Sequence, residues 1–145
     1  AKILAETLKN NGFKIYSGGT DTHLMLVDLR PFNVKGNLAS ESLCRANITC
    51  NKNGIPFDTE KPMITSGIRL GSQAATTRGF GLKEFEKVGE LITKVIKGLS
   101  QNPEDNSKVE NEVRKEVISL CSNFPIYKNL NKWFVPAQRK ERLQL

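Results

Sequence analysis

A single arginine lies in an otherwise small and apolar stretch near the middle of the chain, and its setting is suited to binding a small acid. Arg69 follows the apolar segment 63–68 and lies between Gly67 and Gly71. Glycine lets another backbone or a ligand approach closely. A guanidinium binds a carboxylate through two parallel hydrogen bonds, whereas a buried unpaired charge is costly. We therefore expect Arg69 either to bind a small carboxylic acid or to pair with an internal Asp or Glu.

Two further features are candidates for chemistry. His23 is the only histidine, but no nucleophile or paired acid stands beside it, so we expect a structural role at the start of a strand. The segment 51–62 is a polar loop, rich in Asn, Gly and Pro, that leads to a strand. Such loops are common places for ligand contacts, although the same residues are also ordinary turn formers, and the residues alone favour the turn.

The cysteines and charges limit the class of protein. There are three cysteines without paired spacing and no C-x-x-C, which favours a reducing cytoplasm over a disulfide framework and does not predict a zinc site. The net charge is +7, of which +4 lies in residues 128–145. The charge of the remaining residues therefore gives only weak support for nucleic-acid binding. No apolar run approaches the roughly 20 residues that span a membrane.

The 145 residues are enough for one modest domain with a core. Hydrophobic periodicity predicts strands and helices that are mixed without strict alternation, and the clearest is an amphipathic helix over 82–99. We therefore expect an α+β fold: a two-layer sandwich in which a small mixed or antiparallel sheet is covered by helices on one face. The expected helices are 2–10, 37–46, 72–78, 82–99 and 107–121, and the expected extended segments are 13–16, 23–29, 48–50 and 63–68.

Three blocks carry a specific resemblance. They are SGGTDTHLMLVDL (residues 17–29), RANITCNKN (45–53) and TSGIRLG (65–71). In content, order and approximate spacing they resemble the C-terminal part of serine hydroxymethyltransferase. The resemblance covers residues 1–127 and implies the small C-terminal domain of a fold-type I pyridoxal-phosphate enzyme. Residues 128–145 lie beyond the point where the family's chain normally ends, and we expect a basic tail there, disordered or an added extension.

The resemblance implies an activity and places residues in it. The family interconverts serine and glycine and moves a one-carbon unit to or from tetrahydrofolate, with pyridoxal 5′-phosphate as cofactor. Arg69 matches the arginine that binds the substrate carboxylate, and Asn53 matches an asparagine that contacts the folate ring. Arg78 matches a further arginine, which we interpret as supporting or orienting the substrate site. Thr77 departs from the family pattern, in which many members have a second basic residue.

The resemblance also implies what this chain lacks. The family's Schiff-base lysine stretch, Thr-His-Lys-Thr, is absent from the sequence, and the cofactor-stacking His and pyridine-binding Asp belong to the large domain. The chain also begins without Met, in what is predicted to be a helix, which suggests a fragment. We therefore expect the chain alone to be inactive, and the full enzyme to be a cytoplasmic homodimer or larger assembly without a nucleic-acid or membrane partner.

Two other classes of function are compatible with the residues. One is a free-standing basic module that binds nucleic acid, which the net charge favours and the concentration of that charge in residues 128–145 disfavours. The other is a non-enzymatic interaction domain that uses an open sheet edge or the apolar face of the helix over 88–99.

Overall fold

Four short strands form one antiparallel sheet in the computed structural model, which describes residues 1–126 and 143–144. The central pair is β2 and β5, with Leu26 opposite Arg69. β4 pairs with the other edge of β5, with Asn51 also opposite Arg69. The strands, in their order across the sheet, are β1 (Lys14–Ile15), β2 (Leu24–Asp28), β5 (Gly67–Gly71) and β4 (Asn51–Asn53).

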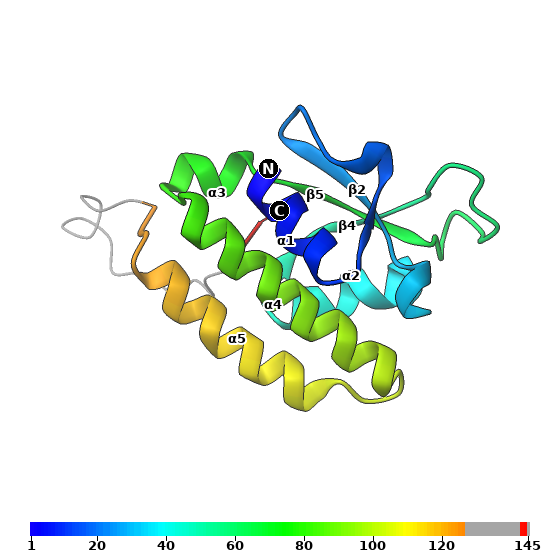
Figure 1. Ribbon diagram of the computed structural model, residues 1–145. Helices are drawn as coiled ribbons and strands as arrows, with labels where there is room; N and C mark the ends of the chain where they lie inside the picture. Colours follow the sequence, from blue (N-terminus) through cyan, green and yellow to red (C-terminus); the bar gives the residue numbers. More distant parts are fainter. Residues whose placement is uncertain (127–142, 145) are drawn as a thin grey trace.

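The helices gather on one side of this sheet (Figure 1). The longest, α4, packs against both α1 and α5, and the short α3 directly follows β5. This arrangement confirms the predicted α+β class with a small sheet. The helices are α1 (Lys2–Asn10), α2 (Gly36–Arg45), α3 (Gln73–Arg78), α4 (Leu82–Gln101) and α5 (Ser107–Ser122), with 3-10 turns at η1 (Tyr16–Gly18) and η2 (Arg30–Phe32).

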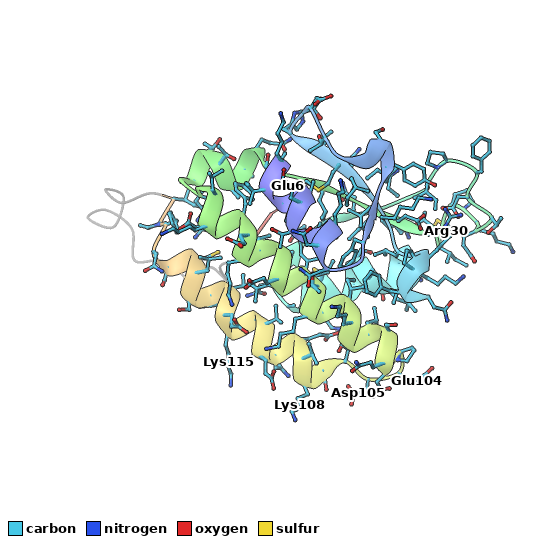
Figure 2. The ribbon with its side chains drawn as sticks, in the orientation of Figure 1. Glu6, Arg30, Glu104, Asp105, Lys108 and Lys115 are labelled. Carbon is cyan, nitrogen blue, oxygen red and sulfur yellow. The ribbon has the colours of Figure 1, made fainter. Side chains whose placement is uncertain are left out.

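The core lies between the sheet and the helices. The apolar face of α4 is buried, as its helical spacing predicts, and so are alternate residues of β2 and β5. Charged side chains such as Lys108 and Lys115 point away from the body along the outer side of α5 (Figure 2). The sheet therefore has a covered face and an uncovered one. The residues that β2 and β5 bury toward the helices are Met25, Val27, Ile68 and Leu70.

Two predicted boundaries around β5 are wrong. The strand expected over residues 63–68 begins only at Gly67, because residues 62–64 form a turn and Thr65 has a positive φ of 62°, which breaks an extended chain. Residues 51–53, expected to be loop, form strand β4. Its Asn-Lys-Asn sequence lacks the apolar alternation that identifies a strand, because Lys52, which shares the covered side with Ile68, is polar as well and only half-buried.

The predicted domain boundaries, residues 1–127, stay a prediction; the elements from α1 to α5 span residues 2–122. Of the predicted tail, residues 128–142 and Leu145 lie outside the described residues. Leu143–Gln144 forms strand β6, which pairs in parallel with β3 (Ile48–Thr49) as a separate two-stranded sheet. The expectation that the tail is disordered therefore applies only to residues that the structure does not describe.

A buried polar cluster joins α2 to α5. Glu110 is 5% exposed, and its carboxylate accepts hydrogen bonds from Ser42 Oγ at 2.6 Å and from Arg45 Nε and Nη2 at 2.7 Å each. Asn106 Nδ2 donates to Ser42 Oγ at 3.1 Å and to the Val95 carbonyl at 3.0 Å. Burial acts to raise the pKa of Glu110, but the hydrogen bonds from Arg45 and Ser42 outweigh it, and the pKa is lowered.

We expect Glu110→Gln to lower the free energy of unfolding at neutral pH by about 2 kcal/mol, because the amide cannot accept all three hydrogen bonds and Ser42 is left poorly paired. A carboxyl with a lowered folded-state pKa stabilises above the unfolded-state pKa, and this stabilisation is lost as the pH falls through the folded-state pKa. The difference from the parent chain should therefore shrink below about pH 4. Urea unfolding measured across pH tests both expectations.

Glu112→Gln on the same helix is the matched control. Glu112 pairs with Lys94 at 3.2 Å, but its side chain is 48% exposed, so its removal should change stability by less than about 0.5 kcal/mol. A loss of the same size for both variants at every pH would show that the buried cluster contributes no more to stability than an exposed ion pair.

Candidate functional site

Arg69 lies in the middle of β5 with its side chain on the uncovered face of the sheet. Its neighbours in the strand, Ile68 and Leu70, are fully buried toward the helices, and alternate residues of a strand point to opposite faces. Arg69 itself is exposed. Leu26 and Asn51 are its partners across the two neighbouring strands, so the guanidinium extends from a site fixed by backbone pairing on both sides.

Arg69 has no ion pair or hydrogen bond to another residue in the part of the chain that the structure describes. The acid that shares its face of the sheet, Asp28, is taken by another cation: Arg30 donates to Asp28 from Nε and from Nη2, at 3.0 and 2.7 Å. Burial acts to raise the pKa of Asp28, but the hydrogen bonds from Arg30 outweigh it and the pKa is lowered. Within residues 1–126, the alternative that Arg69 pairs with an internal carboxylate is therefore not what the fold provides.

A small recess lies beside Arg69. Its volume is about 220 Å³, which suits a small molecule better than a drug-sized ligand. Beyond the recess, Gln73 begins α3 with its side chain folded back toward Gly71. The arrangement places a guanidinium that has no partner among the described residues next to two carboxamides, a donor and acceptor set that fits a small acid with a further polar group. The recess is lined by Leu24, Asn51, Arg69, Leu70, Gly71, Gln73 and Ala74.

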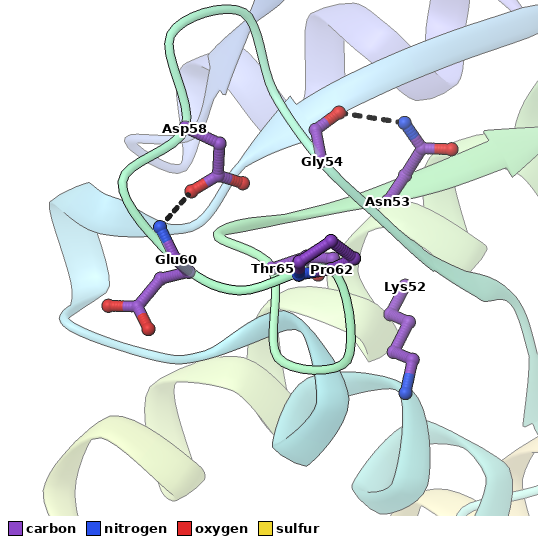
Figure 3. Close-up of a pocket in the computed structure, with 7 residues that line it drawn as sticks. All are labelled: Lys52, Asn53, Gly54, Asp58, Glu60, Pro62 and Thr65. Carbon is purple, nitrogen blue, oxygen red and sulfur yellow. Dashed lines mark hydrogen bonds between the residues drawn. The ribbon is translucent and has the colours of Figure 1, made fainter.

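Asn53 lines a second recess, of about 340 Å³, under the loop that joins β4 to β5 (Figure 3). Its Nδ2 donates to the Gly54 carbonyl at 2.8 Å, which fixes the side chain and leaves Oδ1 available as an acceptor. Asn53 and Asn51 are two residues apart on β4, so both share the uncovered face with Arg69. The sheet therefore brings the two main predicted residues to one face of the molecule. The second recess is lined by Lys52, Asn53, Gly54, Asp58, Glu60, Pro62 and Thr65.

Asp58 holds the loop over this second recess. Its Oδ2 accepts from the backbone N–H groups of Ile55 and Ser66 at 3.1 and 2.9 Å. Its Oδ1 accepts from the Glu60 N–H at 3.0 Å and from Ser66 Oγ at 2.7 Å. Burial acts to raise the pKa of Asp58, but these hydrogen bonds hold it well below its usual range. The loop is therefore tied at three points to one carboxylate.

Arg78 is used differently from the other two predicted residues. It ends α3, and its Nε and Nη2 donate to the carbonyl oxygens of Phe124 and Cys121, at 2.5 and 2.9 Å. Cys121 is in the last turn of α5, and Phe124 follows the helix. Arg78 lines neither of the two recesses. The structure thus places it as a tie between α3 and α5, and its predicted contact with substrate stays a prediction.

Asn51 and Gln73 line the first recess but were not among the residues predicted from the sequence. Recognising that residues 51–53 form a strand would have identified Asn51, because it then alternates with Lys52 and shares a face with Asn53. Gln73 has no comparable signal, since its position depends on how α3 leaves β5.

The exposed His23 makes no side-chain hydrogen bond to the described residues, and its backbone carbonyl accepts from the Ser72 N–H at 2.9 Å.

Lys52, the lysine that lines the second recess, is not positioned beside Arg69 to hold an aldehyde cofactor. Lys52 is in β4, but it is opposite Ile68 and so lies on the other face of the sheet from Arg69; Figure 3 shows it pointing away from Asn53. Its Nζ donates to the Met63 carbonyl at 2.8 Å. Within the described residues there is also no cluster of His, Cys, Asp or Glu that suits a metal ion, and none of the helices is long and apolar enough to cross a membrane.

Fold and site together define a small α+β domain in which Arg69, without a partner among the described residues, lies beside two carboxamides on the uncovered face of the sheet. The chain belongs to the serine hydroxymethyltransferase family, because the family model for serine hydroxymethyltransferase matches residues 1–92. It is 88% identical over 130 residues to a serine hydroxymethyltransferase of Pelagibacter ubique. It is 63% identical over 128 residues to one of a Marinomonas species, and 64% identical over 127 residues to one of Paramagnetospirillum magneticum.

The matches cover most of this chain but only part of each relative. They include 90% of the chain for the Pelagibacter protein and 88% for the other two, and in each case 30% of the relative. The chain therefore spans about 30% of the length of the curated relatives that it matches. The similarity shows the family to which the chain belongs.

Proposed function

We propose that this chain is the C-terminal part of a pyridoxal-phosphate-dependent serine hydroxymethyltransferase, which interconverts serine and glycine with transfer of a one-carbon unit to or from tetrahydrofolate. The observation that supports this most directly is the guanidinium of Arg69, which has no partner among the described residues and lies next to a recess on the uncovered face of the sheet. A charge in that position is suited to the carboxylate of an amino acid.

In this proposal Arg69 fixes the substrate by a bidentate ion pair with its carboxylate. Two parallel hydrogen bonds set the orientation of the carboxylate as well as its position. The pairing of β5 with β2 and β4 holds the Arg69 backbone in place, so part of the ordering cost is met by the fold. Pyridoxal phosphate, when bound, supplies the electron sink for the reaction. Arg69 then orients the amino acid toward it.

Asn53 is proposed to contact the folate ring. A carboxamide both donates and accepts, which suits the edge of a pterin, and the free acceptor of Asn53 is Oδ1. The Asp58-tied loop supports this role, because it keeps the segment after Asn53 in one conformation. We assign Arg78 a supporting role: by tying α3 to α5 it holds the helix that follows the carboxylate-binding strand.

The rest of the active site is proposed to lie in the part of the relatives that this chain does not span. The Schiff-base lysine would come from there, so the chain alone is expected to be inactive. The complete enzyme is proposed to be a cytoplasmic homodimer or larger assembly that acts on serine, glycine and tetrahydrofolate, and not on nucleic acid. None of the three cysteines forms a disulfide among the described residues, in keeping with a reducing compartment.

A chimaeric enzyme tests the proposal. The matching segment of the Pelagibacter enzyme is replaced by this chain, and serine-to-glycine conversion with tetrahydrofolate is measured. We expect activity within about tenfold of the parent, because 88% of 130 residues are identical. In the chimaera, Asn53→Ala should raise the KM for tetrahydrofolate by about tenfold, the loss of one good hydrogen bond, and leave the KM for serine unchanged.

Asn102→Ala at the exposed C-terminal end of α4 is the matched control, and it should leave both KM values unchanged. A folded chimaera without activity would contradict the proposed function. Equal effects of Asn53→Ala on the KM for serine and the KM for tetrahydrofolate would contradict the folate role alone.

A further inference from the structure

The strand β3 is separate from the main sheet and has a single described partner. In residues 1–126 and 143–144, β3 pairs only with β6, in a two-stranded parallel sheet. Ile48 is opposite Leu143, and Thr49 is opposite Gln144. After β3 the chain passes through Cys50 and enters the main sheet as β4. The backbone edge of β3 is therefore not satisfied by the four-stranded sheet.

β3 is nevertheless firmly held by the body of the protein. Ile48 is fully buried, and β3 contacts α2. Asn47, directly before it, has a positive φ of 65°, so the chain enters β3 through a defined turn after α2. A strand that is anchored through its side chain while its backbone edge is not paired within the main sheet can accept another extended chain through main-chain hydrogen bonds.

The strand that pairs with this edge, β6, comes from a different part of the sequence than β3. β3 lies within residues 1–92, which match the family model, whereas β6 lies outside them. Parallel pairing needs a long connection between the two strands, and β6 follows α5 only after residues 123–142. β6 also contacts α3. The edge thus belongs to the part that matches the family model, and the strand that pairs with it lies outside that match.

Backbone pairing selects a partner strand by its direction and extended conformation more than by its sequence, since the hydrogen-bonding groups are the same for all residues except proline. The pairing spans only two residues on each strand, and short terminal pairings open at low cost. These two properties make the contact exchangeable.

We propose that the outer edge of β3 is a strand-acceptor site, which in this chain binds the chain's own C-terminal strand β6 and exchanges it for a free extended segment of the same sequence. The ligand is an extended peptide that runs parallel to Ile48–Thr49. The proposal concerns a different surface from the Arg69 and Asn53 recesses, and it does not depend on the enzyme activity.

Amide hydrogen exchange on the full 145-residue chain tests this proposal. In the double variant Leu143→Pro/Gln144→Pro the C-terminal strand loses two N–H groups and its extended pairing. The amide of β3 that faces β6, at Ile48 or Thr49, should then exchange about tenfold faster or more. The matched control is Leu143→Ala/Gln144→Ala, which keeps both N–H groups and should retain the slow exchange. Equal exchange of both β3 amides in the proline variant and the parent overturns the proposal.

A synthetic peptide of residues 139–145 provides the second arm. Added to the proline variant, it should restore slow exchange at the β3 amide in a saturable manner, and the same peptide with proline at both strand positions should not. Added in excess to the isotope-labelled parent chain, the unmodified peptide should shift the resonances of Ile48 and Thr49, which tests the site without any substitution in the protein. Failure of the peptide to affect β3 in either chain would show that the edge does not accept a strand in trans.

Discussion

Arg69→Lys in the chimaeric enzyme is expected to lower kcat/KM for serine by about 100-fold or more, because an ammonium is a point charge that does not set the orientation of a carboxylate. Both residues carry the same charge, so the loss would measure orientation and bidentate pairing instead of attraction alone. Steady-state kinetics at saturating tetrahydrofolate give the ratio directly. The KM for tetrahydrofolate should stay unchanged, since Asn53 and its loop are untouched.

The structure makes this variant a clean test. Arg69 has no hydrogen bond or ion pair with the described residues and its side chain is exposed, so the free energy of unfolding should change by less than about 0.5 kcal/mol. Arg114→Lys on α5 is the matched control, because Arg114 also lacks such contacts among residues 1–126; it should leave kcat/KM unchanged. If Arg69→Lys keeps full kcat/KM in an active chimaera, Arg69 does not bind the substrate carboxylate.

The helices and the class of fold were predictable because helical periodicity is a strong local signal. The apolar residues of α4 repeat at helical spacing and are buried, with the exception of Leu82, which is 70% exposed at the start of the helix. Two features of the sheet had no such signal. β4 carries asparagines on the uncovered face, and β5 begins at a glycine after a turn. A polar strand on an uncovered face has the same local sequence pattern as a loop.

The candidate site was predictable only in part, for a related reason. Arg69 is conspicuous because it is a lone cation between apolar residues and glycines. What the sequence does not reveal is which carboxylates are already paired, and here Asp28 is paired with Arg30. Similarly, the tie between Arg78 and the carbonyls of Cys121 and Phe124 joins residues more than forty positions apart in the sequence. Residue types do not indicate such hydrogen bonds to distant backbone carbonyls, so these contacts could not be predicted from the sequence.

Gly67→Ala is expected to destabilise the chain by about 3 kcal/mol or more, the largest stability loss that we expect from a single methyl group here. Gly67 lies in the sheet between Asp28 of β2 and Asn53 of β4. A Cβ at this position would lie 2.5 Å from Ile55 Cγ2, 2.7 Å from the Val27 carbonyl oxygen and 3.0 Å from the Asn53 carbonyl oxygen. The isoleucine can move, but the two carbonyls belong to both neighbouring strands, so relief requires the strands to separate. Urea unfolding of the 145-residue chain measures the loss.

The same displacement should reach the site, because the Asn53 carbonyl is one of the groups that must move. In the chimaera, Gly67→Ala should therefore raise the KM for tetrahydrofolate even where the enzyme remains folded. Gly19→Ala is the matched control: its backbone is extended, with φ of 172°, and no atom lies within 4 Å of the added Cβ. It should be neutral or stabilise by about 0.4–1 kcal/mol through the unfolded state. If the two alanine variants are equally stable, the packing of β5 between β2 and β4 is looser than the structure indicates, and Asn53 is not held in place by it.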